Sequence, residues 1–493
     1  MKKSQVWGSH LSDSPDDKFV KFCSGRDVES LSMADYELIP YDILTNLAHI
    51  DGLHKINVLD STEHQQIKAG LLQIHSLHEK QQFHLLPDKE DVHFNIEYFL
   101  TNHLKITAAE KIHTGRSRND QVTTDIRLYS RQKALQFGME IINLAKTIAD
   151  FASKHIDTIV PGFTHGQPAM PTTIAHWVSS WAFSLIRDAD FLFSDIIRFN
   201  LSPLGSAASF GTSWNPDREY VSQLLGFTEP QENTLDCITN KSEYETRLAS
   251  TISHASVHFN TICQDVYWLS HPYFQFLKLP DKFVSGSSIM PHKKNPDFAE
   301  IIRGKTSLCH GYTSALWGIE KSSISGYNRD LQSTKYLIMD IFREISPIPS
   351  ILSSIIKAIE IDIVKCEEKS MEHFIYSADL ADFISRKYKI SFRSSYNITA
   401  VIVKYSTQGI INLPAAEKAF HELLPGSKID DELMNIVNNP KSLLQTKTHT
   451  GAPSPESVTK SLNKLNADIS KLREKYIDLN NKIDQCLSNL LSS

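Results

Sequence analysis

Residues 113–144 read HTGRSRNDQVTTDIRLYSRQKALQFGMEIINL, and this stretch decides the fold class. Its first part is polar and contains a glycine, whereas its second part repeats apolar side chains at helical spacing from Ile126 to Leu144. An apolar pattern of this length and period predicts one long helix. Residues 174–197 form a second long apolar-rich run. Long helices joined by short loops are typical of a helical bundle.

The rest of the chain agrees with an all-α fold. It has 19 Gly among 493 residues, where an average usage of about 7% would give roughly 35. No run of six or more residues alternates cleanly between apolar and polar side chains, and no Asn-Gly hairpin turn occurs. We expect three parts: an N-terminal helical domain over 1–112, a central long-helix bundle over 113–365 and a C-terminal helical domain over 366–493.

The C-terminal residues show a heptad pattern, in which apolar side chains recur in alternating steps of four and three. Such a helix can join a partner chain or pack on its own domain, and we favour packing on its own domain. The apolar positions are Val458, Leu462, Leu465, Ile469, Leu472, Tyr476, Leu479, Ile483, Cys486 and Leu490.

Composition excludes several functional classes. The net charge is −6 and is spread without long blocks of one sign, so no nucleic-acid-binding face is indicated. The first residues lack the apolar segment of a signal peptide, and no stretch approaches the roughly 20 apolar residues of a membrane span. The six cysteines are scattered without a CxxC pair. These features predict a soluble cytoplasmic protein.

The polar segment 284–300, VSGSSIMPHKKNPDFAE, is the strongest candidate for chemistry. Asn295 is a favourable N-cap and Pro296 suits a first helical turn, so we expect a helix to begin there. A helix N-terminus beside Lys293 and Lys294 attracts a carboxylate or phosphate. A solvated basic helix start is an equally good reading of composition alone.

Three further polar segments carry candidate site residues. Segment 113–121 can hold a carboxylate through its Arg, Ser, Thr and Asn side chains. Segment 162–173, GFTHGQPAMPTT, surrounds His165, which is either structural or an acid–base group. Segment 325–335, SGYNRDLQSTK, places four polar side chains within a few turns: Tyr327, Asp330, Gln332 and Lys335.

No metal or cofactor site is predicted. His254 and His258 lie at i,i+4 spacing, and His75 and His78 are also close, but neither pair has an HExxH context. We interpret both pairs as ordinary helix positions. No glycine-rich phosphate loop occurs either, so nucleotide-dependent chemistry has no support.

Taken together, these segments resemble the argininosuccinate lyase family of the fumarase/aspartase superfamily. SGSSIMPHKKNP is similar to the superfamily pattern GSSxMPxKxNP, and HTGRSRNDQVTTDIRLY is nearly the argininosuccinate lyase form of its segment. The likeness extends to both ends of the chain. It includes QVWGSHL, PYDILTNLAHI, EDVHFNIE, PLGSAASFGTSWNPDRE and SADLADFISRK.

The resemblance implies a three-part, mainly helical subunit in a homotetramer, with each active site built from three subunits. The implied reaction is reversible β-elimination of fumarate from an N-substituted aspartate, without metal or organic cofactor. Argininosuccinate, giving arginine and fumarate in the last step of arginine biosynthesis, is the leading substrate. No nucleic acid or membrane partner is implied.

The resemblance also assigns roles to residues. Ser287 and His165 form the catalytic pair, which we interpret as base and acid respectively; the reverse direction stays open, and Ser288 is an alternative to Ser287. Lys293, Asn295 and the helix N-terminus suit stabilisation of a dianionic carboxylate. The family's substrate-binding positions are matched by Asp35, Asn119, Thr164, Tyr327, Gln332 and Lys335, and Ser117 and Arg118 are expected to line the same carboxylate site.

The sequence departs from the family at positions that bear on the amine half of the substrate. THLQRAQP is replaced by THGQPAMP, with the change over Gly166–Met170, and SDRDF is replaced by TNKSE, with Asn240–Ser242 at its centre. A substrate-contacting serine is replaced by Leu31. Alternatives are therefore a lyase for another aminosuccinate, an adenylosuccinate-like lyase, or a non-catalytic structural relative.

Overall fold

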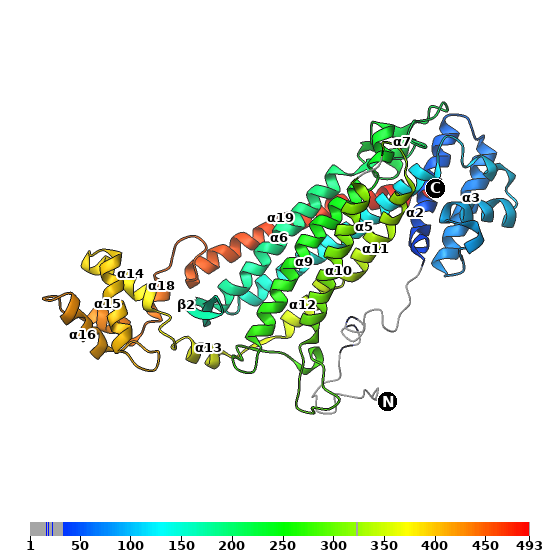
Figure 1. The fold of residues 1–493 in the computed structure, drawn as a ribbon. Helices are drawn as coiled ribbons and strands as arrows, with labels where there is room; N and C mark the ends of the chain where they lie inside the picture. Colours follow the sequence, from blue (N-terminus) through cyan, green and yellow to red (C-terminus); the bar gives the residue numbers. More distant parts are fainter. Residues whose placement is uncertain (1–15, 17, 19–21, 23–32, 322–323, 493) are drawn as a thin grey trace.

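The computed structural model describes residues 16, 18, 22, 33–321 and 324–492. Long, roughly parallel or antiparallel helices run along the molecule (Figure 1) and confirm the all-α prediction. The bundle contains α5 (Arg118–Ala152), α6 (Ile174–Arg198), α9 (Glu243–Leu269), α10 (Asp297–Glu320), α11 (Thr334–Ile345), α12 (Ile348–Ala358) and α19 (Pro455–Ser492).

Shorter helices lie at the two ends of this bundle. One end carries α2 (Ala34–Lys55), α3 (Ser61–Glu79), α4 (Val92–Tyr98), α7 (Arg218–Leu224) and α8 (Thr234–Thr239). The other carries α13 (Ile363–Lys369), α14 (Ser377–Tyr388), α15 (Phe392–Tyr405), α16 (Leu413–Leu423), α17 (Asp431–Asn438) and α18 (Ser442–Gln445). Short 3-10 or π turns occur at Pro87–Lys89, Phe99–His103, Thr107–Lys111, Asp281–Phe283 and Arg329–Ser333.

Strands are few and short within the described residues. β1 (Ile159–Thr164) and β2 (Gln167–Thr173) form an antiparallel hairpin between α5 and α6. Two further pairs have two residues per strand. They are parallel β3 (Leu201–Ser202) with β4 (Glu229–Pro230), and antiparallel β5 (Leu277–Lys278) with β6 (Glu360–Ile361).

The buried apolar residues form two separate cores. The larger core joins the N-terminal helices, the central bundle and α19, whereas a smaller core lies within residues 375–443. Apart from α19, which returns to pack with α5 and α6, the two cores meet between Cys366, which belongs to the larger core, and Ile375. The predicted domain bounds stay a prediction. The heptad positions of α19, such as Leu465 and Ile469, are buried within this one chain. α19 therefore packs within this chain as favoured, but on the central bundle and not on the C-terminal domain predicted over 366–493.

α5 shows how sequence sets the local structure. Ser117 is its N-cap, and Asp120 completes a capping box with it. Further along, Gly138 lets Tyr476 of α19 approach the α5 backbone, because a Cβ at that position would overlap the tyrosine ring. The Tyr476 hydroxyl then donates a 2.7 Å hydrogen bond to the carbonyl of Ala189 on α6. One glycine therefore permits three helices to meet.

Cys237, Cys263, Cys309 and Cys366 are buried free thiols and Cys486 is a partly buried one, whereas Cys23 lies outside the described residues. Among the described helices, none is both long and apolar enough to cross a membrane.

Candidate active site

The start of α5 presents Ser117, Arg118 and Asn119 on a tightly fixed backbone. Asp120 Oδ1 accepts a 2.9 Å hydrogen bond from the Ser117 amide. Its Oδ2 accepts hydrogen bonds of 2.9 and 2.8 Å from the amides of Gly205 and Ala207. One buried carboxylate therefore holds two loops of the site together.

Arg118 extends from this helix start towards acidic side chains. Its Nη1 lies 3.2 Å from both Glu90 Oε2 and Asp91 Oδ2, and its side chain is about half exposed. Exposed ion pairs of this kind are weak, so an anionic ligand can compete for the guanidinium. The expected role of Arg118 in binding a carboxylate stays a prediction.

Other predicted substrate positions lie at the same end of the molecule. Lys335 and Asp35 form an ion pair that joins α11 to the start of α2. The second oxygen of Asp35 accepts a 3.1 Å hydrogen bond from the Val92 amide. Gln332 Nε2 donates a 2.9 Å hydrogen bond to the hydroxyl of Tyr327. The structure thus brings these predicted substrate positions together in two contacting pairs, Asp35 with Lys335 and Tyr327 with Gln332.

Segment 239–243, where the sequence departs from the family, contacts this group. Thr239 Oγ1 accepts a 2.8 Å hydrogen bond from the Gly326 amide, and Lys241 Nζ lies 5.5 Å from the ring centroid of Tyr327. Burial lowers the pKa of Lys241 to about 8 and raises the pKa of Glu245 to about 7. The sequence showed that Lys241 replaces an arginine, but its burial beside Tyr327 depends on tertiary packing.

A buried polar network packs against the first turns of α5. His93 Nδ1 lies 2.8 Å from Asp42 Oδ1 and 3.6 Å from Asp125 Oδ2. Burial, reinforced by the charge of Asp42, raises the pKa of Asp125 well above its usual value. Arg116 is buried here, hydrogen bonds to Asn46, and supplies a positive charge to both carboxylates. We interpret this network as structural support, because Arg116 already provides the cation.

His165 lies at the opposite end of the bundle, at the tip of the β1–β2 hairpin. His165 and Gly166 both have positive φ angles, 56° and 70°, and form a two-residue turn between the paired residues Thr164 and Gln167. Positive φ at both central positions is typical of a type I′ hairpin turn. Thr164 and His165 are exposed within a single chain. The sequence did not predict this hairpin, because its His-Gly turn lacks the usual asparagine.

Ser287 lies in a loop closed by paired backbone hydrogen bonds between Ser285 and Asn295, of 2.9 and 2.8 Å. The Ser287 Oγ accepts hydrogen bonds of 3.3 and 3.1 Å from the amides of Ile289 and Met290. Such bonds favour the negatively charged form of an oxygen. This contact is one that the sequence could not give. The predicted role of Ser287 as a base stays a prediction.

The helix after this loop begins later than predicted. α10 starts at Asp297 with Pro296 in the N-cap position, and Asn295 does not cap it, because its backbone pairs with Ser285. Lys293 is exposed, whereas Lys294 Nζ lies 2.6 Å from Asp281. Lys293 is therefore the better of the two lysines for binding a ligand.

One chain separates the candidate residues into two groups. Asn119 begins α5, and the hairpin follows the end of this 35-residue helix, which at 1.5 Å per residue is about 52 Å long. The hairpin and the segment before Ser287 share one end, where the rings of Phe163 and Phe274 lie 5.8 Å apart. Figure 1 shows β2 and α2 at opposite ends of the bundle.

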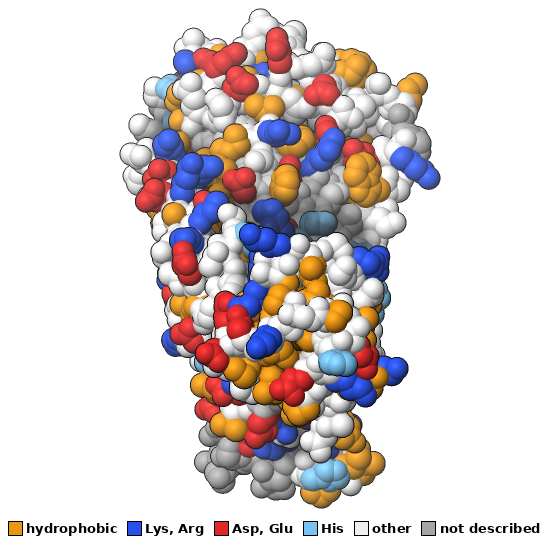
Figure 2. Space-filling view, turned by 90° about the vertical axis from the view of Figure 1, so that its left-hand side faces the viewer, with side chains coloured by type: hydrophobic (Ala, Val, Ile, Leu, Met, Phe, Trp, Pro, Cys, Tyr) orange, Lys and Arg blue, Asp and Glu red, His pale blue; other side chains and the backbone are white. Residues whose placement is uncertain are grey.

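A cavity of about 840 Å³ lies beside the hairpin, between α6 and the C-terminal helices. It contacts Thr164 and Met170 on the hairpin side and Arg386 and Lys447 on the other. Figure 2 shows this end of the molecule, where side chains of both charge signs surround a hollow. The hairpin that carries His165 therefore borders a recess lined by basic and acidic groups, the latter being Asp379 and Asp382.

Known proteins match the chain along most of its length. A family model described as "Lyase" matches residues 15–311. The argininosuccinate lyase of Hahella chejuensis is 34% identical over 92% of this chain and 95% of its own. Argininosuccinate lyase 2 of Pseudomonas fluorescens is 36% identical over 93% and 96%.

The chain belongs to the argininosuccinate lyase family. Solved structures agree on the fold of this family member. A crystal structure of EDDS lyase in complex with formate has a TM-score of 0.84, with 22% identity over 98% of this chain and 95% of that one. A class II fumarase from Schistosoma mansoni has a TM-score of 0.69, with 14% identity over 88% and 96%. The resemblance deduced from the segments is thus confirmed, as is the superfamily's helical fold.

Proposed function

We propose that this protein cleaves argininosuccinate to arginine and fumarate. The observation that carries the proposal is the 34–36% identity to curated argininosuccinate lyases over more than nine-tenths of the chain. Retention of HTGRSRND and GSSIMPHKKNP supports it, because these segments supply the groups that the elimination requires. A non-catalytic relative would have no chemical need for all of them.

In the proposed reaction, Ser287 takes a proton from the carbon next to a carboxylate. The electron pair of that C–H bond forms the double bond of fumarate, while the C–N bond breaks and its pair stays on nitrogen. His165 protonates that nitrogen. Lys293 and Asn295 stabilise the negative charge that develops on the carboxylate. Asn119, Thr164 and Tyr327 would orient the substrate, together with Ser117, Arg118, Gln332, Lys335 and Asp35.

The proposal includes a homotetramer whose sites are shared between subunits. The separation of Asn119 from His165 along α5 supports sharing, because residues so far apart cannot touch one substrate. A line of glycines on α10, Gly304, Gly311 and Gly318, faces open space in the single chain. Large apolar side chains are also exposed along the bundle, on α6 (Phe191), α9 (Val257) and α10 (Leu308 and Trp317). Close packing of helices from other copies would cover these features.

A second candidate is a lyase for a different aminosuccinate. The buried Lys241 beside Tyr327 favours it, because the departure in that segment reaches a predicted substrate position. Replacement of an arginine by a lysine alters both shape and hydrogen bonding. In this second candidate the substrate has a different amine half, while the half that becomes fumarate is the same.

The test is to incubate the purified protein with argininosuccinate and follow fumarate by ultraviolet absorbance and arginine by chromatography. Adenylosuccinate and other N-substituted aspartates form the comparison panel. We expect fumarate and arginine in equal amounts from argininosuccinate. If fumarate forms only from another aminosuccinate, the protein is a lyase for that substrate and not for argininosuccinate. If no aminosuccinate gives fumarate, the protein is a non-catalytic structural relative.

A further inference from the structure

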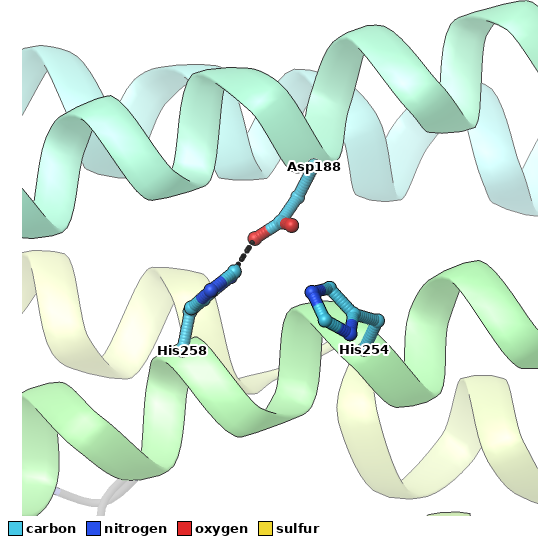
Figure 3. Close-up of side chains that lie close together, drawn as sticks. All are labelled: Asp188, His254 and His258. Atoms are coloured by element: carbon cyan, nitrogen blue, oxygen red, sulfur yellow. Dashed lines mark hydrogen bonds and ion pairs between the residues drawn. The ribbon is translucent and has the colours of Figure 1, made fainter.

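Three side chains that the proposed reaction does not use converge midway along the bundle. Asp188 of α6 faces His254 and His258 of α9 (Figure 3), and one ligand atom of each lies within 4.8 Å of the others. His258 Nδ1 lies 2.6 Å from Asp188 Oδ2. The i,i+4 spacing places both imidazoles on one face of α9, and α6 supplies the carboxylate that the sequence could not place opposite them.

The surroundings of Asp188 favour a bound cation. Its side chain is only 3% exposed, and the ionic partner that the structure gives it is His258. A buried carboxylate requires a compensating positive charge, and a cation bound between Asp188 and the two imidazoles would supply one. His254 is exposed, and its ring approaches that of His258 at right angles, with centroids 5.2 Å apart. Both rings therefore lie close enough to Asp188 to bind the same ion.

We propose that Asp188, His254 and His258 bind one divalent transition-metal ion of the zinc type. Two imidazoles and a carboxylate are a ligand set that zinc accepts, with water completing a tetrahedron. At metal–ligand distances of about 2.0–2.1 Å, two ligand atoms of a tetrahedron lie roughly 3.3 Å apart. Because the three ligand atoms here are separated by up to 4.8 Å, binding requires the exposed His254 side chain to move towards the other two. The ion then takes the place of the proton between His258 and Asp188.

The position of the site indicates a structural role. His254 and His258 lie in the middle of the 27-residue α9, more than ten residues, or about 15 Å along the axis, from either end. The candidate catalytic residues lie at the ends of the bundle. The ion would clamp α6 to α9, so its removal should lower thermal stability while leaving the chemistry of elimination in place. This proposal does not depend on the proposed function.

The experiment uses the full chain, freed of metal with a chelator and then titrated with Zn²⁺ by calorimetry. Cobalt(II) serves as a second probe, because a site with nitrogen and oxygen ligands gives a visible absorption band. We expect about one ion per chain, and a rise in the melting temperature on binding. Asp188→Asn should weaken binding by at least tenfold, and His254→Ala with His258→Ala should abolish it together with the cobalt band.

The matched control is the double variant His84→Ala and His421→Ala, which removes two exposed histidines outside α6 and α9 and should bind as the parent does. His254→Ala alone changes an exposed side chain, so it provides a variant that folds even if the double variant does not. Absence of binding by the parent would overturn the proposal. Equal binding by the parent and His254→Ala would overturn it as well.

Discussion

Ser287 is the proposed base, and its hydroxyl oxygen accepts hydrogen bonds from two backbone amides within a loop closed between Ser285 and Asn295. Ser287→Ala removes the oxygen that takes the proton, and His165→Asn removes the group that returns one. Each change should lower kcat by at least about 10²-fold, the lower end for loss of acid–base help. Steady-state fumarate release measures this.

Ser288→Ala is the matched control for Ser287→Ala, because it removes the neighbouring hydroxyl from the same loop. It should retain most of the activity. An inactive Ser288→Ala beside a fully active Ser287→Ala would move the base by one residue. Circular dichroism should show unchanged helix content in all three variants, since these side chains lie outside both cores.

Asp120 fixes the backbone at the start of α5, which carries Asn119, without contacting substrate in the proposed site. Its carboxylate accepts hydrogen bonds from the amides of Ser117, Gly205 and Ala207. Asp120→Asn replaces one accepting oxygen by a donor, so at least one buried amide loses its partner. The expected loss is about 1–3 kcal/mol of unfolding free energy, together with a higher KM because Asn119 loses its support. Thermal unfolding and substrate titration measure the two effects.

Asp60→Asn is the control for this prediction, because Asp60 also closes a capping box but lies at the exposed start of α3. It should cost less stability and leave KM unchanged. Equal effects of the two substitutions would contradict a special role for the burial of Asp120.

At the scale of elements, the long helices could be predicted because their apolar period persists over many turns. The His165 hairpin could not, since β1 and β2 contain prolines and their turn is His-Gly. α10 starts one residue later than predicted, because the backbone pairing of Asn295 with Ser285 is a tertiary feature. Likewise, no local pattern shows that Asp188 faces His258 or that Lys241 is buried.

The contact between α5 and α19 at Gly138 gives a prediction for packing. Alanine usually favours a helix by about 1 kcal/mol over glycine, yet a Cβ here would overlap the ring of Tyr476. Gly138→Ala should therefore destabilise the protein, by about 1–3 kcal/mol for overpacking. Chemical denaturation measures the change.

The double variant Gly138→Ala with Tyr476→Leu tests the cause. A smaller side chain at 476 makes room for the new methyl group, so the two changes together should cost less than the sum of the separate costs. Simple additivity would show that the methyl group is accommodated elsewhere.

At the scale of the whole molecule, the glycine line of α10 gives a prediction for assembly. Gly304, Gly311 and Gly318 have no atom within 4 Å of an added Cβ in the single chain. If a second copy packs there, Gly311→Leu should convert tetramers into smaller species on light scattering. The exposed Lys471 of α19 provides a control, because Lys471→Leu adds the same side chain on another helix and should leave the tetramer intact. A tetrameric Gly311→Leu would place the interface elsewhere.

The central claim is that residues from different chains complete one active site, since a single α5 separates Asn119 from His165 by the length of the bundle. The most direct measurement mixes inactive His165→Asn and Ser287→Ala proteins after dissociation and reassembly. Some mixed sites should then contain an intact histidine and an intact serine, so partial fumarate release should return. Each protein treated alone should stay inactive. No recovery from verified mixed tetramers would contradict the contribution of His165 and Ser287 by different chains, and full activity in a monomer would contradict any shared site.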